Sequence, residues 1–363
     1  MTPSILAACS PGEVRIAVLR DGDLLDYAIW RPGAPDGVGD LHRGRVIARV
    51  PAMAGCFVAL GGGEGFLPDS EGGASLHQGD HVSVRVSRAA QGGKGPRLTA
   101  RLGADDEPPA RGPGPLLELS RCYPDAPVLV DDAALAARLK PALGGRMRAV
   151  AAAFDEPLEE QVEALARPTV ELNGGRRLHI HPTPALVAID VDAGGAVAGS
   201  AGKAASHLAA NRAMLPVLVR QIRLRNLSGA ILVDFAGLAV RRRASLAPAL
   251  QTALAEDNLH PRLLGFTALG LAEIVRPRVH PPLHELLAGP HAAGLAALRR
   301  IANEVAVPPH RMLALRASPP VVAALETDTD ALADLARRAG RTLILRSDPN
   351  LPATAWMIET NHD

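Results

Sequence analysis

Aromatic residues, paired cysteines and long apolar runs are all scarce in this sequence. Phe, Trp and Tyr make up 2% of the 363 residues, so the cores must be built from Ala, Val and Leu. Cys9, Cys56 and Cys122 form no Cys-x-x-Cys pair, which excludes a recognisable zinc knuckle and favours a reducing compartment. No run of about 18 apolar residues occurs, so no transmembrane helix is expected. These absences predict a cytoplasmic protein.

The sequence also lacks a strong net charge. Lys and Arg number 39 against 38 Asp and Glu, which leaves +1 at pH 7. A protein-wide attraction for polyanions is therefore excluded, and any nucleic-acid surface must be a local patch. In contrast, 35 Gly and 31 Pro predict many turns and short elements. The length is sufficient for two or more domains with separate cores.

The first hundred residues read as short β-strands. Residues 14–30 hold two strand-like runs around Asp21-Gly22, which predicts a hairpin. Five further short runs between residues 44 and 102 predict a small OB-type barrel. The Pro- and Gly-rich segment 104–115 reads as a linker.

From residue 126 onward the pattern alternates between strands and helices. Strands are predicted within 126–132, 176–192 and 230–235, and helices within 133–143, 157–166, 203–226 and 241–257. Residues 262–278 are predicted to run from a strand into a helix. The tail from 292 alternates helix and strand, which indicates a small α/β module.

Two apolar strands each end in a carboxylate. Asp190 and Asp234, 44 residues apart, close the runs "ALVAID" and "AILVD". Each Asp could simply cap the turn that follows. However, sites in open α/β sheets gather at the carboxyl ends of strands, and paired carboxylates there suit Mg²⁺. Asp192 could point to the same side of the strand as Asp190.

The small residues after Asp192 raise a nucleotide-binding alternative. The segment "DAGGAVAGSAGKAAS" fails the Walker pattern, because Val197 stands at the first Gly position and Ala204 replaces the Mg²⁺-binding Ser or Thr. A phosphate-transferring enzyme using this loop stays an alternative, beside a merely flexible loop.

Two arginine runs flank the strand that ends at Asp234. Solvated helix faces explain such runs, but a phosphate backbone would also suit them. The arginines concerned are Arg220, Arg223, Arg225, Arg241, Arg242 and Arg243. Phe57 and Phe66 lie in the predicted barrel, where they are either core residues or platforms for base stacking.

Several segments together resemble the ribonuclease E/G family. "ALVAIDVDAG" and "NLSGAILVDFAGL" are similar to its two catalytic strands, and "NRAMLPVLVRQIRLRNLSG" to the helix between them. "GDLHRGRVIARVPAMAGCFVALGGGEGFLP" resembles its S1-class RNA-binding domain. The resemblance covers most of the chain.

The resemblance implies a mixed, multidomain α/β fold. Its implied parts are the hairpin (1–39) of an RNase H-like subdomain, an S1-class OB barrel (40–103), a shortened sensor region (104–115), the rest of the RNase H-like subdomain (116–182), a DNase I-like catalytic domain (183–288) and a small C-terminal domain (289–363).

The resemblance also implies an endoribonuclease that cuts single-stranded RNA and leaves a 5′-phosphate. Asp190 and Asp234 stand at the family's Mg²⁺-binding positions, with Asp192 as a supporting catalytic residue. Unpaired RNA would be held by the barrel and by the two arginine runs. The barrel residues expected to contact it are Phe57, Phe66, Arg45 and Lys94.

The chain departs from the family pattern at four places. Asp192 replaces an Asn and Gly237 replaces an Asp, so an RNA-binding protein without turnover is the alternative function. No Cys-Pro-x-Cys zinc link follows residue 278, so a homodimer would pair through the small domain without zinc. The shortened region at 104–115 implies weak dependence on the 5′ end of the RNA.

Overall fold

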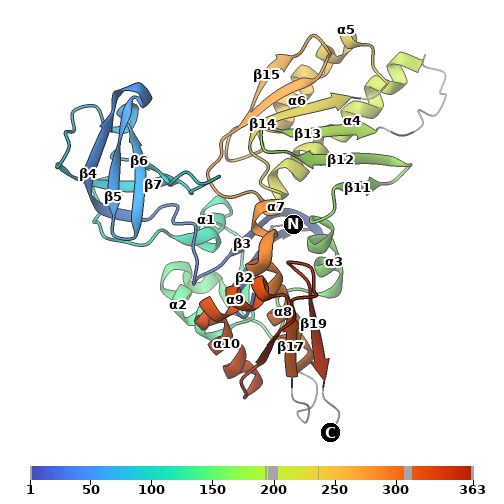
Figure 1. Cartoon of the computed structure of the whole chain (residues 1–363). Coiled ribbons are helices and arrows are strands. Elements are labelled where there is room, and N and C mark those ends of the chain that lie inside the picture. The colour runs from blue at the N-terminus through green and yellow to red at the C-terminus, as the bar shows by residue number, and fades with distance from the viewer. Residues whose placement is uncertain (1, 193, 195–202, 236, 306–312, 361–363) are drawn as a thin grey trace. The chain divides into compact units, whose positions relative to one another are not determined.

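A computed structural model describes residues 2–192, 194, 203–235, 237–305 and 313–360, and shows a mixed α/β fold (Figure 1). The chain divides into two compact units. Unit 1 comprises Met1–Gly33, Cys122–Pro277 and Pro282–Asp363. Unit 2 comprises Ala34–Arg121 and Arg278–Pro281.

Unit 2 is built around a closed five-stranded barrel with strand order β4-β5-β6-β8-β7. Its strands are β4 (Leu41–Val50), β5 (Gly55–Leu60), β6 (Gly63–Pro68), β7 (His81–Arg88) and β8 (Arg97–Thr99). Alternate residues fill the interior, among them Val46, Cys56, Val58, Leu67 and Leu98. The predicted five-stranded barrel is therefore confirmed, and it fits an OB-like domain. Residues 104–113 belong to no helix or strand. Within this segment Ala110 forms an isolated β-bridge with Leu41, and α1 (Gly114–Cys122) follows.

A histidine between two carboxylates holds residues 278–281 within unit 2. His280 Nδ1 lies 2.6 Å from Asp36 Oδ2, and its Nε2 lies 3.2 Å from Glu118 Oε2. Burial by itself lowers the pKa of His280, but the hydrogen bonds and charges of the two carboxylates outweigh it and raise the pKa to about 9. At neutral pH His280 is therefore an imidazolium ion that is held by both carboxylates.

We expect this contact to make the stability of unit 2 depend on pH. Because the folded pKa lies above the ordinary value near 6.5, the stabilisation is complete below about pH 6.5 and is lost as the pH rises through about 9. Urea unfolding of the wild type and His280→Gln should differ by about 2–3 kcal/mol at pH 6 and by almost nothing at pH 10. A difference that stays constant across this range would contradict the charged clamp.

Unit 1 begins with a five-stranded sheet of order β10-β9-β1-β2-β3. Its elements are β1 (Ser4–Ser10), β2 (Glu13–Arg20), β3 (Asp23–Trp30), β9 (Val128–Val130), β10 (Met147–Ala149), α2 (Ala133–Leu143) and α3 (Glu156–Ala164). The predicted hairpin is confirmed: Asp21 and Gly22 both have positive φ (55° and 84°), as a tight hairpin turn requires. Strand β1, which the sequence did not predict, lies between β2 and β9.

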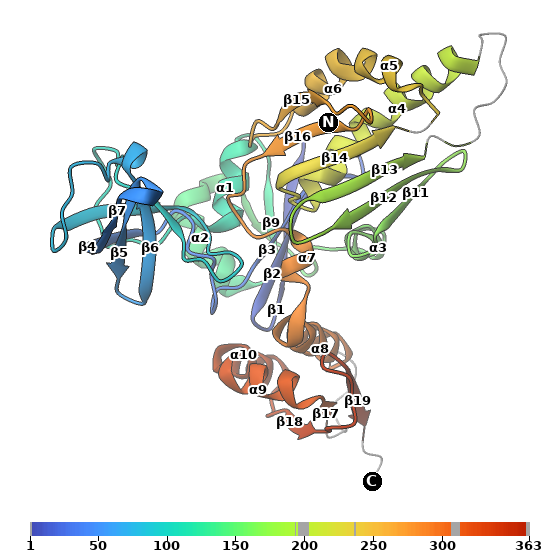
Figure 2. The ribbon, with the colours of Figure 1, turned by 45° about the horizontal axis from the view of Figure 1, so that its top comes forward.

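The next part of unit 1 is a six-stranded sheet of order β11-β12-β13-β14-β16-β15. Its strands are β11 (Thr169–Leu172), β12 (Arg176–Pro182), β13 (Val187–Asp192), β14 (Gly229–Phe235), β15 (Arg262–Phe266) and β16 (Ala272–Arg276). Its helices are α4 (Lys203–Leu224), α5 (Val240–Arg243) and α6 (Ala247–Leu254), and Figure 2 shows α4 and α6 along one face.

The helix predicted at the end of 262–278 is wrong. Residues 272–276 form β16, which pairs antiparallel with both β14 and β15. Ala272 and Ile274 are buried while Glu273 and Val275 are less so, which is the alternation of a strand. The prediction relied on the helix-forming residues of "LAEIV". In the structure, pairing with two neighbouring strands overrides this local propensity.

After the short helix α7 (Leu283–Leu286), unit 1 ends in a small α/β module with sheet order β18-β17-β19. Its elements are α8 (Gly289–Val305), β17 (Leu313–Ala317), α9 (Pro319–Thr327), α10 (Thr329–Ala339), β18 (Ile344–Ser347) and β19 (Trp356–Thr360). Leu295, Leu298, Leu315 and Leu325 centre its core. In the described part of the chain, no helix combines the length and apolarity that crossing a membrane requires.

Candidate active site

The two strand-end carboxylates lie side by side. Strands β13 and β14 pair in parallel, and Asp190 is the direct register partner of Asp234. Partners on adjacent strands are about 4.8 Å apart and point to the same face of the sheet. Residues far apart in the sequence therefore meet at the carboxyl ends of two neighbouring strands.

Burial decides which face carries these carboxylates. Ile189 and Val191 on β13, and Val233 and Phe235 on β14, are at most 2% exposed and belong to the core shared with α4 and α6. The alternate residues must then point away from the helices. Asp190 is exposed, and the Asp234 side chain is 46% exposed. The hydrophobic pattern thus places both carboxylates where solvent and substrate can reach them.

Arg243 is part of this site. Its Nη1 donates to Asp234 Oδ1, and its Nε donates to the Leu238 carbonyl at 3.1 Å. The Arg243 side chain is only 14% exposed, so its guanidinium is held against the carboxylate and does not move freely in solvent. Any cation that binds Asp234 must share that carboxylate with Arg243 or displace it.

Asp192 lies on the same face as Asp190, two residues further along β13. Its Oδ1 accepts a hydrogen bond from the Gly194 N–H at 3.0 Å, so the carboxylate shapes the turn after the strand. An Asn could accept that bond equally well. Most of the glycine-rich segment behind the nucleotide-binding alternative, residues 195–202, lies outside the described residues.

Gly237 stands where the family pattern has an Asp, and His207 of α4 occupies the adjacent space. Gly237 has φ +75°, and a Cβ built there would lie 2.3 Å from His207 Nδ1. A side chain at position 237 would therefore be strained in its backbone and would collide with the imidazole. A glycine at position 237 therefore fits the local packing.

The two carboxylates fit a magnesium ion that keeps open positions. Mg²⁺ is commonly held by one or two carboxylates and retains several waters. Within the described ranges, no three His, Cys, Asp or Glu side chains lie close enough to hold a metal together. These residues therefore offer a two-carboxylate site rather than a closed cage.

The arginines of the first run do not form one exposed surface. Arg220 lies 3.4 Å from Asp23, and Arg223 Nε lies 3.0 Å from Asp26. Arg225 is only 6% exposed, so the RNA-binding role predicted for it does not fit its position. It directly follows Leu224, the last residue of α4. The arginine-rich sequence around this residue predicted exposure, not burial.

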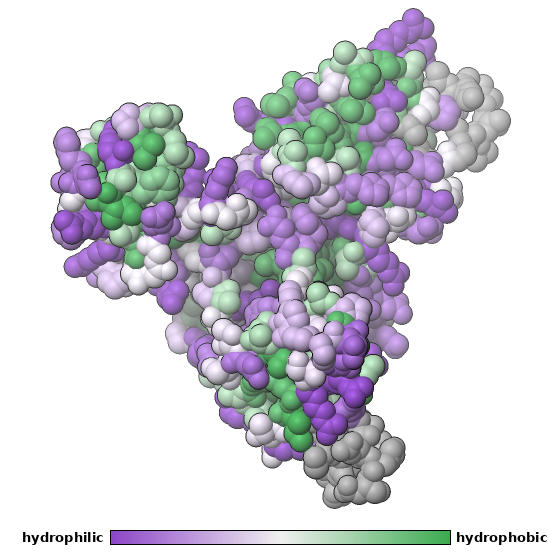
Figure 3. Space-filling model, viewed as in Figure 1, coloured by the Kyte–Doolittle hydropathy of each residue, from purple (hydrophilic) through white to green (hydrophobic). Residues whose placement is uncertain are grey.

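The second arginine run is more open. Arg241 and Arg242 of α5 are exposed. Exposed apolar side chains lie in the same part of unit 1, where Figure 3 shows green residues over β15 and α6. The exposed large apolar side chains of unit 1 include Val240, Leu264 and Leu269, which are 50%, 61% and 74% exposed.

On the barrel, Phe57 and Phe66 form an aromatic pair outside the core. They are register partners on β5 and β6, with ring centroids 5.4 Å apart in an edge-to-face arrangement. Both are half-buried, and their neighbours Cys56 and Leu67 fill the barrel interior instead. The pair therefore presents aromatic surface on the outside of the barrel.

Two arginines that the sequence did not single out continue this surface. Arg97 pairs with Phe66 across β6 and β8, and Arg88 pairs with Arg97 across β7 and β8. Burial and the nearby charges of Arg97 and Arg278 lower the pKa of Arg88, which shows how close these cations lie. Of the predicted contacts, Arg45 is exposed on β4, and Lys94 is exposed in the turn before β8.

The central part of the chain is similar to known proteins. Residues 139–279, which contain both Asp190 and Asp234, match the model of the Ribonuclease E/G family. This central segment is therefore similar to the Ribonuclease E/G family.

Named relatives match a stretch of similar length. Ribonuclease E of Nostoc sp. is 35% identical over 145 residues, or 39% of this chain and 21% of that protein. Ribonuclease G of Escherichia coli K12 is 30% identical over 131 residues, or 36% of this chain and 27% of that protein. A chloroplastic Ribonuclease E/G-like protein of Arabidopsis thaliana is 32% identical over 143 residues, which make up 38% of this chain and 14% of that protein. The chain thus spans less than a third of the length of each relative.

Proposed function

We propose that this protein is an endoribonuclease that cuts single-stranded RNA at a Mg²⁺ site formed by Asp190 and Asp234. The observation that carries the proposal is the register pairing of these two carboxylates on adjacent parallel strands. A bound Mg²⁺ would stabilise charge on the phosphodiester and activate water, so that the downstream product keeps a 5′-phosphate.

The chain's own residues would position the RNA. Asp190 and Asp234 place negative charge at one point on the open sheet face, and Arg243 next to them supplies a cation for the phosphate. On the barrel, Phe57 and Phe66 would stack on unpaired bases while Arg88 and Arg97 contact the backbone. Asp192 would support the site by fixing the turn after β13.

The finer architecture belongs to the same proposal. Residues 1–39 and 116–182 would form the RNase H-like subdomain, 40–103 the S1-class domain, 104–115 the shortened sensor region and 183–288 the DNase I-like domain. Two copies would pair through 289–363 without a zinc link, and work in RNA processing or decay in the cytoplasm. Sedimentation of the whole chain tests the pairing.

Cleavage of a fluorescent AU-rich RNA tests the activity and the shortened sensor region together. We expect cleavage with Mg²⁺, none with EDTA, and rates with 5′-hydroxyl and 5′-monophosphate ends within about threefold, a difference of less than 1 kcal/mol in barrier. A much faster reaction of the 5′-monophosphate RNA would contradict the absence of 5′-end sensing while leaving the nuclease assignment intact.

An RNA-binding protein without turnover is the second candidate. The ion pair of Arg243 with Asp234 favours it, because a guanidinium already neutralises one of the two carboxylates. Gly237, packed under His207, also removes an acidic group from the site. RNA that is bound but stays intact in Mg²⁺ would establish this alternative.

A further inference from the structure

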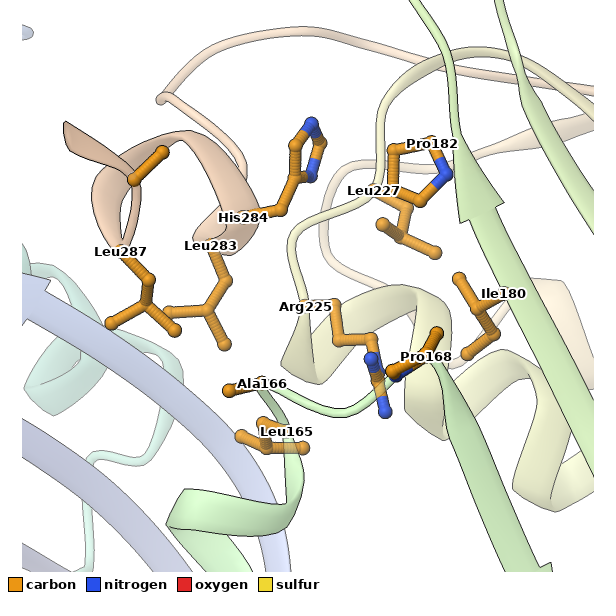
Figure 4. A pocket seen from close by; sticks show the side chains of 11 residues that line it. Leu165, Ala166, Pro168, Ile180, Pro182, Arg225, Leu227, Leu283, His284 and Leu287 are labelled. Atoms are coloured by element: carbon orange, nitrogen blue, oxygen red, sulfur yellow. The ribbon is translucent and has the colours of Figure 1, made fainter. Parts of the chain in front are cut away.

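A pocket in unit 1 lies apart from the candidate active site. Its volume is about 310 Å³, within the range of small-molecule sites. Figure 4 shows side chains from four chain segments around it. These segments contribute Leu165, Ala166 and Pro168; Ile180 and Pro182; Arg225 and Leu227; and Leu283, His284, Leu287 and Ala288.

The pocket has an apolar floor and an open rim. Ile180, Leu227, Leu283 and Leu165 are at most 5% exposed. Around the rim, Pro182, His284, Leu287 and Ala288 are exposed. The walls are fixed to one another, because the Leu283 N–H donates to the Arg225 carbonyl at 2.9 Å. A ligand would therefore enter a pre-formed cup and bury its apolar part.

Arg225 places an uncompensated cation in this apolar lining. Its Nε donates to Gln221 Oε1 at 3.0 Å and its Nη1 to the Arg167 carbonyl at 2.6 Å, while its buried Nη2 has no hydrogen-bond partner. Among the residues that the structure describes, no carboxylate pairs with it. Burial lowers the pKa of Arg225 to about 10. A buried charge without a counter-ion is costly, and an anion would relieve that cost.

We propose that this pocket binds a small organic carboxylate with an apolar body. Floor and walls suit a hydrocarbon or aromatic group, and the guanidinium suits the carboxylate. One buried guanidinium balances one negative charge, which favours a monoanion over a doubly charged phosphate. The proposal does not rest on the nuclease function: pocket-lining Ile180 is buried on the core face of the sheet, whereas Asp190 and Asp234 lie on the opposite, open face.

Displacement of the dye 1-anilinonaphthalene-8-sulfonate from the whole chain tests the proposal. We expect octanoate to displace the dye at a concentration at least about tenfold lower than octan-1-ol, because the positive charge of Arg225 in the lining attracts the carboxylate but not the hydroxyl group. Ala288→Phe, which fills the rim, should abolish dye binding. Ala213→Phe, at an exposed position on α4, should leave it unchanged.

Arg225→Gln tests the role of the charge. In this variant the preference for octanoate over octan-1-ol should fall to about twofold, with folding checked by circular dichroism. If Arg225→Gln does not fold, the proposal is tested by two other comparisons. These are octanoate against octan-1-ol on the wild type, and dye binding by Ala288→Phe against Ala213→Phe. Three results would each overturn the proposal: equal displacement by octanoate and octan-1-ol, no dye binding by the wild type, or unchanged dye binding by Ala288→Phe. The pocket would then hold only water.

Discussion

Replacing Asp190 by Asn should lower the rate of RNA cleavage about a thousandfold while the protein stays folded. The amide has the same shape as the carboxylate but no charge to hold a divalent cation. Because Asp190 is exposed at the end of β13, the change removes no core packing. Metal assistance contributes several kcal/mol to phosphodiester cleavage, and a loss of about 4 kcal/mol corresponds to that thousandfold reduction.

Asp234→Asn should have a similar effect on the rate, because Asp234 is the register partner of Asp190. It also removes the carboxylate that holds Arg243, so the two variants should differ in RNA affinity more than in rate. Asp125→Asn, an exposed position in the same unit, is the matched control. Rates are measured by single-turnover cleavage across a Mg²⁺ titration. Full activity of Asp190→Asn at every Mg²⁺ concentration would remove the carboxylate pair from the mechanism.

Replacing Phe57 or Phe66 by Ala should weaken binding of single-stranded RNA about tenfold. Stacking of a base on an aromatic ring contributes about 1–3 kcal/mol, and 1.4 kcal/mol is a factor of ten. The two rings contact each other edge to face, so the loss of either also leaves the other less firmly placed. The double variant should therefore lose less than the product of the two single effects.

Fluorescence anisotropy with an uncleaved oligonucleotide measures this loss, and Phe57→Tyr, which keeps a ring, is the matched control. The barrel should stay folded, because neither ring belongs to its buried core. Arg97→Ala should instead reduce the salt dependence of binding by about one unit of slope, as expected for a phosphate contact. Unchanged RNA affinity in both Phe variants would move the binding surface elsewhere on the protein.

Several features of this protein are determined by local sequence alone. Apolar runs that close on Asp190 and Asp234 predicted two strands, which the structure extends to Asp192 and Phe235, and five short β runs predicted the barrel strands. Asp21-Gly22 predicted the hairpin turn, because a two-residue turn needs residues that accept positive φ. Each of these depends on chemistry within a few residues of chain, which is why a sequence pattern can carry it.

The contacts between distant segments were decided only by the tertiary structure. The register that aligns Asp190 with Asp234, and the pairing that makes 272–276 a strand, arise from neighbouring strands rather than from local propensity. Arg243 and Arg225 look like ordinary surface arginines in the sequence, yet one pairs with Asp234 and the other lies buried beside a pocket. Charge and periodicity specify which residues prefer water, whereas packing of elements far apart in the chain decides which of them are kept from it.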